Sequence, residues 1–290
     1  MKILYATDGS PASDAAAALL ESVGNKAGVE LSVVAVVEPE PQLPEAYAVE
    51  AQVLEEAGAR AREAVHQTTD RLTAAGFSAQ GEVLSGWPGS AILHAAKDDE
   101  QDLVVVGAGR HSWLGSLLLG STSMHILHSS PVSVVLVHES PAESRPVRIL
   151  LATDGSPSAR RAVALLSGFA DPQQCAVTVL SVARIPYAAA AGPPYAPMAG
   201  VGSALIDELR EKARLRVNEA ADELERMGFQ TETVATEGSP HHLIVEEADK
   251  GGYDLVVVGS RGHGALSRSL VGSVSDAVAR NARAVLIARP

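Results

Sequence analysis

The 290-residue chain is poor in cysteine, in aromatic residues and in long apolar segments. Its one cysteine, Cys175, cannot form an internal disulfide, which is typical of proteins in a reducing compartment. No apolar run approaches the roughly 18 residues that a membrane-spanning helix needs, and residues 1–10 contain no hydrophobic signal region. We therefore expect a cytoplasmic protein with no membrane partner.

The chain also has no surplus of basic residues. Its formal net charge is −12 at pH 7, and an acidic surface repels the phosphate backbone, so we expect no nucleic-acid partner. The acid is unevenly distributed: residues 1–145 contain 8 Lys and Arg against 19 Asp and Glu, whereas residues 146–290 contain 15 against 16. With 3% aromatic residues, the cores must consist mainly of Ala, Val and Leu.

Several signatures of catalysis are missing. The sequence has no G-x4-G-K-[ST] loop, which argues against a P-loop ATPase, and no G-x-S-x-G elbow, which argues against a nucleophilic hydrolase. His241 and His242 are adjacent at a predicted helix start and point to different faces, so we expect no shared metal ion there. We predict no catalytic residue and no metal site.

The two halves of the chain repeat one pattern. Residues 3–11 align with residues 149–157 at an offset of 146, and Gly120-Ser121 aligns with Gly272-Ser273 at an offset of 152. The second copy therefore has a net insertion of six residues, which we place in a Pro/Ala/Gly-rich loop at 185–202. We predict two domains, at residues 1–140 and 146–290.

Within each copy, short apolar runs alternate with helical patterns. Runs such as 103–106 and 255–258 lack alternation, which is typical of a strand covered on both faces. Strands that alternate with helices indicate crossover connections and a parallel sheet. We predict an α/β fold of two tandem doubly wound domains, each a five-stranded parallel sheet with helices on both faces. The predicted strands are 2–7, 30–37, 79–84, 102–107 and 132–138, then 147–153, 175–182, 231–236, 254–259 and 284–288.

The glycines after the fourth strand of the second domain indicate a phosphate-binding loop. Gly259 and Gly262 precede Gly272 and Ser273, which open the last predicted helix. Glycine lets backbone N–H groups approach a phosphate, and a helix N-terminus favours an anion. The segment contains Arg261 and no Asp or Glu, which supports an anion site. The alternative is a tight turn and a capped helix without a ligand.

The pattern G-x2-G-x9-G-S, with the Asp-Gly-Ser turn after the first strand, resembles the ATP-binding subgroup of the universal stress protein family over essentially the whole chain. The resemblance implies the doubly wound fold, a role in the stress response, and an ATP site, often with Mg2+, in each competent domain. It also implies that the two domains pair through their last strands, and it leaves a homodimer open.

By this resemblance the aspartate contacts the nucleoside, two backbone segments line the adenine, and the glycines and serine hold the phosphates. The residues expected at the nucleotide in the second domain are Ala152, Asp154, Val182, Gly259, Arg261, Gly262, Gly272, Ser273 and Val274.

The first domain departs from the pattern because Arg110 stands where the second glycine is expected. Its side chain either blocks the close backbone approach or supplies a guanidinium that binds phosphate itself. We therefore expect the second domain to be the stronger ATP site. The candidates in the first domain are Ala6, Asp8, Gly107, Arg110, Gly120 and Ser121.

The expected function is an ATP-dependent switch, or a chaperone-like or signalling module. Two alternatives stay open. One is a weak ATPase or phosphotransferase in which Asp154 and a bound Mg2+ polarise the phosphates. The other is a nucleotide-free scaffold that dimerises through its last strands. AMP or another adenine nucleotide also remains open as the ligand.

Overall fold

The computed structural model describes residues 1–38, 47–109, 119–142, 146–185, 199–262 and 271–290. In the first half, the strands are β1 (Lys2–Ala6), β2 (Glu30–Val37), β3 (Ser78–Ser85), β4 (Leu103–Gly107) and β5 (Ser133–Val137). The helices of this half are α1 (Pro11–Val23), α2 (Tyr47–Ala74), α3 (Pro88–Asp98) and α4 (Ser121–Ser129).

The second half repeats this order of elements. Its strands are β6 (Val147–Ala152), β7 (Cys175–Ala183), β8 (Gln230–Glu237), β9 (Leu255–Gly259) and β10 (Ala284–Ala288). Its helices are α5 (Pro157–Phe169), α7 (Ala199–Arg226), α8 (Pro240–Lys250) and α9 (Ser273–Asn281). Each bound of the ten strands lies within one residue of its prediction, and the α/β, doubly wound fold class is confirmed. The loop predicted at 185–202 is too long at its end, because α7 already begins at Ala199.

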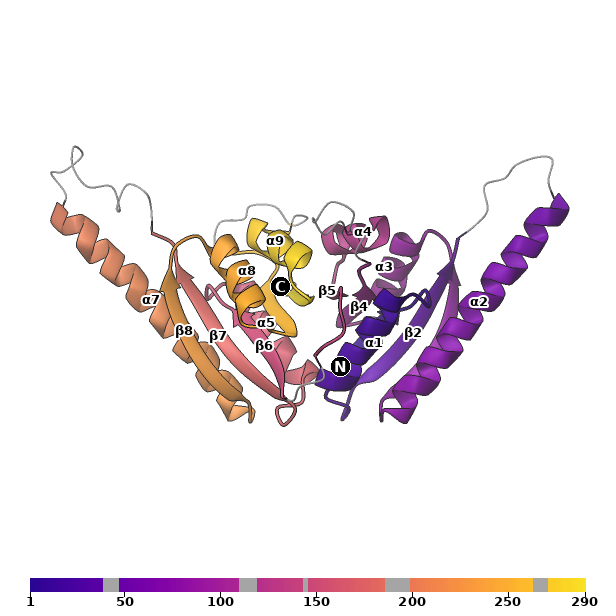
Figure 1. The fold of residues 1–290 in the computed structure, drawn as a ribbon, viewed down its shortest axis with the longest axis horizontal. Helices are drawn as coiled ribbons and strands as arrows, with labels where there is room; N and C mark the ends of the chain where they lie inside the picture. The colour runs from indigo at the N-terminus through magenta and orange to yellow at the C-terminus, as the bar shows by residue number, and fades with distance from the viewer. Residues whose placement is uncertain (39–46, 110–118, 143–145, 186–198, 263–270) are drawn as a thin grey trace.

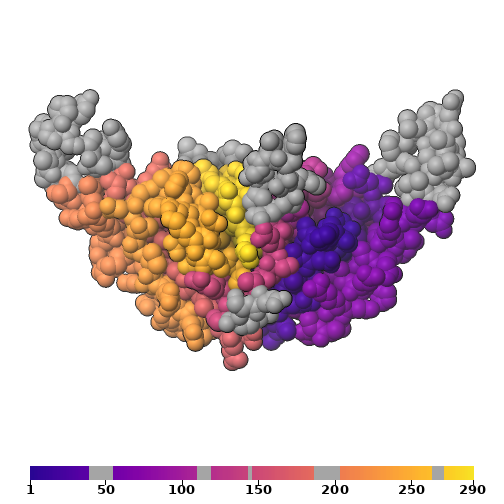
Figure 2. Space-filling view, in the orientation of Figure 1, coloured from indigo at the N-terminus to yellow at the C-terminus, as the bar shows by residue number. Residues whose placement is uncertain are grey.

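The strands form one ten-stranded sheet in the order β3-β2-β1-β4-β5-β10-β9-β6-β7-β8. Within each half all neighbours are parallel, and β5 pairs with β10 antiparallel, for example Leu136 with Val285. The molecule is a crescent in which the halves meet at β5 and β10 and the long helices α2 and α7 lie at opposite ends (Figures 1 and 2).

The core lies on both faces of this sheet. Alternate residues of β4 separate into the two clusters: Leu103 and Val105 pack with α1 and α2, whereas Val104 and Val106 pack with α3 and α4. The second half has the same arrangement, with α5 and α7 on one face and α8 and α9 on the other. Unbroken apolar strands are needed because both faces are covered. None of the helices within the described ranges is both long and apolar enough to cross a membrane.

The first helix of each half is capped by a serine. The Ser10 hydroxyl accepts a hydrogen bond from the Ser13 amide, and the Ser156 hydroxyl accepts one from the Ala159 amide, both at 3.3 Å. A proline follows each cap, where its missing N–H has no intrahelical partner to lose. These caps place the turns after β1 and β6 at the carboxyl edge of the sheet.

Candidate functional site

A cavity of about 560 Å³ lies at the carboxyl ends of the strands in the second half. It sits beside β9 and β6, where the strand order of this half reverses, which is the usual ligand position in an open α/β sheet. All nine residues predicted for this domain line it, and they come from four separate segments of the chain. They are Ala152, Asp154, Val182, Gly259, Arg261, Gly262, Gly272, Ser273 and Val274.

The turn after β6 holds Asp154 in place at this cavity. The Gly155 amide donates to Thr153 Oγ1 at 3.2 Å, and the Ser156 amide donates to Asp154 Oδ1 at 3.0 Å. Gly155 has a φ of +75°, a conformation that favours glycine. One oxygen of the Asp154 carboxylate is therefore engaged by the turn that positions it.

Two glycines of the motif are explained by packing inside the protein. A Cβ on Gly259 would lie 2.6 Å from Ser158 Oγ and 2.8 Å from the Ala159 amide nitrogen, so this glycine allows α5 to approach the end of β9. A Cβ on Gly262 would lie 2.6 Å from Asp154 Oδ2. Close contact with α5 and Asp154 is thus a reason for both glycines, besides any approach of a ligand.

Gly272 differs, because it is the N-cap of α9 and no side chain caps this helix. The Gly272 amide donates to Ser260 O at 2.8 Å, and Ser275 Oγ donates to Gly259 O at 2.7 Å, which ties the first turn of α9 to the end of β9. The first-turn amides and the positive end of the helix dipole thus lie at the cavity, where they favour an anion.

Serine and arginine residues that the sequence analysis missed complete this site. The hydroxyls of Ser156 and Ser158 both donate to Arg261 O, which anchors the loop after β9 to the start of α5. Arg184 follows β7 and Arg216 lies on α7, and both line the cavity beside Arg261. A comparison of the two repeats could have singled out these arginines, because the first half has Glu38 and Ala64 where the second half has Arg184 and Arg216.

The first half has a corresponding cavity of about 740 Å³. The predicted residues that line it are Ala6, Asp8, Gly107, Gly120 and Ser121, whereas Arg110 lies outside the described residues. A Cβ on Gly107 would lie 2.4 Å from the Ala12 carbonyl carbon, whereas a Cβ on Gly120 meets no described atom within 4 Å. The described lining contains Asp8, Glu38 and His138 but no Lys or Arg.

Two residues at the junction of the halves contact backbone carbonyl groups across it. His138 lines the first cavity, and its ring nitrogens lie 2.8 Å from Ala108 O and 2.8 Å from Ala279 O in α9. Arg289 follows β10 and donates to Leu127 O in α4 at 2.7 Å. Burial, and then the nearby charge of Arg261, lower the pKa of the Arg289 guanidinium.

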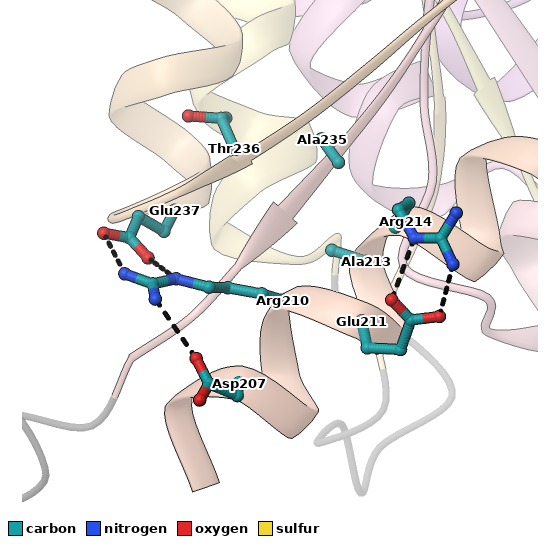
Figure 3. A pocket seen from close by; sticks show the side chains of 8 residues that line it. All are labelled: Asp207, Arg210, Glu211, Ala213, Arg214, Ala235, Thr236 and Glu237. Atoms are coloured by element: carbon teal, nitrogen blue, oxygen red, sulfur yellow. Dashed lines mark hydrogen bonds and ion pairs between the residues drawn. The ribbon is translucent and has the colours of Figure 1, made fainter. Parts of the chain in front are cut away.

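A third hollow, of about 510 Å³, lies between α7 and the edge strand β8 (Figure 3). Figure 3 shows Arg210 between Asp207 and Glu237, and Arg214 paired with Glu211. Arg210 Nε lies 2.6 Å from a Glu237 oxygen, and Arg214 lies 2.6 Å from a Glu211 oxygen. These charges are directed at one another across an exposed groove. The hollow contains no glycine loop or helix N-terminus, so it is not the candidate site.

Comparison with known proteins gives a consistent result. The model of the universal stress protein family matches residues 1–138 and 147–289. Over 224 residues the chain is 30% identical to a universal stress protein of Mycolicibacterium smegmatis, covering 74% of this chain and 70% of the relative. It is 25% identical to a universal stress protein of Mycobacterium tuberculosis, covering 99% of this chain and 94% of the relative.

The fold is also found among solved structures. A universal stress protein from Archaeoglobus fulgidus superposes with a TM-score of 0.68 at 21% identity, covering 99% of this chain and 98% of that chain. This likeness concerns the fold.

Proposed function

This chain belongs to the universal stress protein family, and on that premise we propose that its second domain binds ATP and acts as a nucleotide-dependent switch in the stress response. The observation that carries the proposal is the convergence of nine residues, chosen from sequence alone, on one cavity at the start of α9. The cavity, of about 560 Å³, falls in the usual range for small-molecule sites of roughly 300–1,000 Å³.

The proposed pose is the one that the family resemblance implies, and the polarity of the cavity supports it. The adenine lies against the backbone at Ala152 and Val182, where the lining is apolar, and Asp154 accepts hydrogen bonds from the ribose hydroxyls. The triphosphate lies at the first turn of α9, where the amides from Ser273 onward and the helix dipole favour negative charge.

The arginines that line the cavity support a polyanionic ligand. Arg184, Arg216 and Arg261 face one carboxylate, Asp154, among the described lining residues. Guanidinium groups match phosphate oxygens geometrically and keep their charge at any physiological pH. The cavity is therefore suited to ATP more than to an uncharged ligand.

Mg2+ fits this arrangement as a companion of the nucleotide. Protein-bound Mg2+ usually keeps several waters and binds substrate phosphates, and the Ser273 hydroxyl would be its protein ligand, because Asp154 meets the ribose in this pose. When bound, it would neutralise part of the phosphate charge. The described residues contain no cluster of three His, Cys, Asp or Glu side chains that could hold a metal by themselves.

The charge of one side chain at the helix start tests this function. Gly272→Glu places a carboxylate at the N-cap of α9, so we expect ATP affinity to fall by more than tenfold in isothermal titration calorimetry. The matched variant Gly120→Glu, at the N-cap of α4, should leave this affinity unchanged. Gly272→Ser controls for the presence of a side chain without a charge.

Thermal unfolding gives a second readout. A ligand that binds only the folded state raises stability, by about 2.7 kcal/mol at a hundredfold excess over Kd, so the same ATP concentration should raise the Tm of the wild-type chain more than that of Gly272→Glu. Unchanged ATP affinity in Gly272→Glu would show that the phosphates do not lie at α9.

A further inference from the structure

The two cavities share most of their apolar walls. Because the halves repeat, each wall residue of the first cavity has an equivalent in the second, 146 or 152 residues further along the chain. The side chains are identical at five of these positions, all of which line their cavities. The pairs are Ala6 and Ala152, Val36 and Val182, Pro88 and Pro240, Ile92 and Ile244, and Val106 and Val258.

The turn that would meet a ribose is also the same in both halves. In the first half, the Gly9 amide donates to Thr7 Oγ1 at 3.2 Å and the Ser10 amide donates to Asp8 Oδ1 at 3.0 Å, distances equal to those in the turn that holds Asp154. Gly9 has a φ of +71°. The end of the first cavity formed by the apolar walls and this turn is therefore built as in the second.

The charges around the two cavities differ. Arg184, at the end of β7, is replaced by Glu38 at the end of β2, and both side chains line their cavities. Arg216, on α7, is replaced by Ala64 on α2. A Cβ on Gly155 would lie 3.3 Å from Arg216 Nε, whereas a Cβ on Gly9 would lie 3.5 Å from the Ala64 methyl group, so the two positions correspond in space.

These replacements change which ligand the first cavity favours. Among the residues that the structure describes, two carboxylates, Asp8 and Glu38, border it, where the second cavity has one carboxylate and three arginines. Arg110, in the loop after β4, lies outside these described residues. Like charges disfavour a bound triphosphate, and such repulsion is a common basis for excluding a competing ligand. An uncharged ligand would not meet this repulsion.

We propose that the first cavity binds an uncharged nucleoside, with the base and ribose in the end that matches the ATP cavity. The proposal rests on the function proposed for the second domain, because that function assigns the base and ribose to the shared walls and turn. The hydroxyls of Ser10, Ser121 and Thr122 line the remaining space, where they can exchange hydrogen bonds with a neutral polar ligand. The chain would then bind two different ligands, a nucleotide and a nucleoside.

Calorimetry with adenosine and ATP tests this in the Gly272→Glu chain, in which the phosphate end of the second cavity is blocked. We expect adenosine to bind at least tenfold more tightly than ATP. A matched pair of wall substitutions locates the site, because Val36 lines the first cavity, Val182 lines the second, and both are half-buried. Val36→Trp fills the first cavity and should lower adenosine affinity at least tenfold, whereas Val182→Trp should leave it within about threefold.

Exchange of the differing charges provides a reciprocal test in the same background. Glu38→Arg with Ala64→Arg should raise ATP affinity at the first cavity at least tenfold and leave adenosine affinity within about threefold. In the wild-type chain, Arg184→Glu with Arg216→Ala should lower ATP affinity at least tenfold. Glu38 and Arg184 are exposed and Ala64 and Arg216 are half-buried, so these variants avoid the core.

The outcomes separate the two proposals. Absence of ATP binding by the wild-type chain overturns the function proposed for the second domain. ATP binding as tight as adenosine binding in Gly272→Glu overturns the nucleoside proposal alone. Adenosine binding that is not detected in Gly272→Glu, or that Val36→Trp does not weaken, also overturns it.

Discussion

Gly259 and Gly272 belong to one sequence motif but have different surroundings. Gly259 is enclosed by Ser158 and Ala159 at the start of α5, whereas Gly272 begins a helix with a backbone conformation open to any residue, φ −68° and ψ 156°. The first glycine is therefore explained by packing against α5, whereas a Cβ on the second would come no closer than 3.3 Å, to Ser260 O, a contact that a small shift relieves. A motif that looks like a single phosphate-binding loop thus combines a glycine needed for packing with a glycine that begins a helix.

Alanine substitutions should separate the roles. Gly259→Ala would bring a Cβ within 2.6 Å of Ser158 Oγ, and overpacking of this kind costs about 1–3 kcal/mol. Gly120 corresponds to Gly272 in the repeat and is the N-cap of α4, where a Cβ would meet no described atom within 4 Å. The free-energy cost of Gly120→Ala should therefore stay within the roughly 1 kcal/mol expected at an N-cap. Urea denaturation of both variants measures the difference, and equal losses would contradict the assignment.

At the scale of elements, the strands and the glycine loop could be predicted because their signals are local. Runs such as 103–106 and 255–258 are apolar without alternation, and the loop follows directly after such a run. Arg184 and Arg216 could not be predicted in this way. Arg184 directly follows β7, where no motif marks it, and Arg216 reaches the cavity only because α7 packs against the sheet.

Two arginines of α7 offer a matched comparison. Arg216 lines the proposed ATP cavity, whereas Arg210 pairs with Glu237 in the hollow beside β8 (Figure 3). Arg216→Ala should weaken ATP binding by about three- to tenfold, because it removes a charge from the cavity. Arg210→Ala should leave ATP affinity unchanged. Calorimetry on both variants checks this, and an equal effect would show that α7 contributes only net charge.

For the whole molecule, two contacts link the halves at equivalent positions. His138, after β5, reaches Ala279 O in α9, and Arg289, after β10, reaches Leu127 O in α4. Leu127 and Ala279 are 152 residues apart and therefore correspond in the repeat. Each half thus contacts the last helix of the other half near that helix's carboxyl end. The amino end of the same helix borders the cavity of its own half.

Removal of the His138 contacts should destabilise the molecule. His138 is 7% exposed, and His138→Phe leaves the oxygens of Ala108 and Ala279 without this partner, which costs about 1–3 kcal/mol for buried groups. His66→Phe is the matched control, because the His66 side chain is 70% exposed. Guanidinium denaturation of both variants measures the loss, and an unaltered midpoint for His138→Phe would contradict the linking role.

The antiparallel register of β5 and β10 joins two parts of a single polypeptide. A covalent tether sets the local concentration of one partner around the other, so mass action does not govern their separation. Dilution dissociates a complex of independent subunits, but it therefore leaves the pairing of β5 with β10 intact. Because one polypeptide carries both cavities, the two unlike cavities are always present in a ratio of one to one.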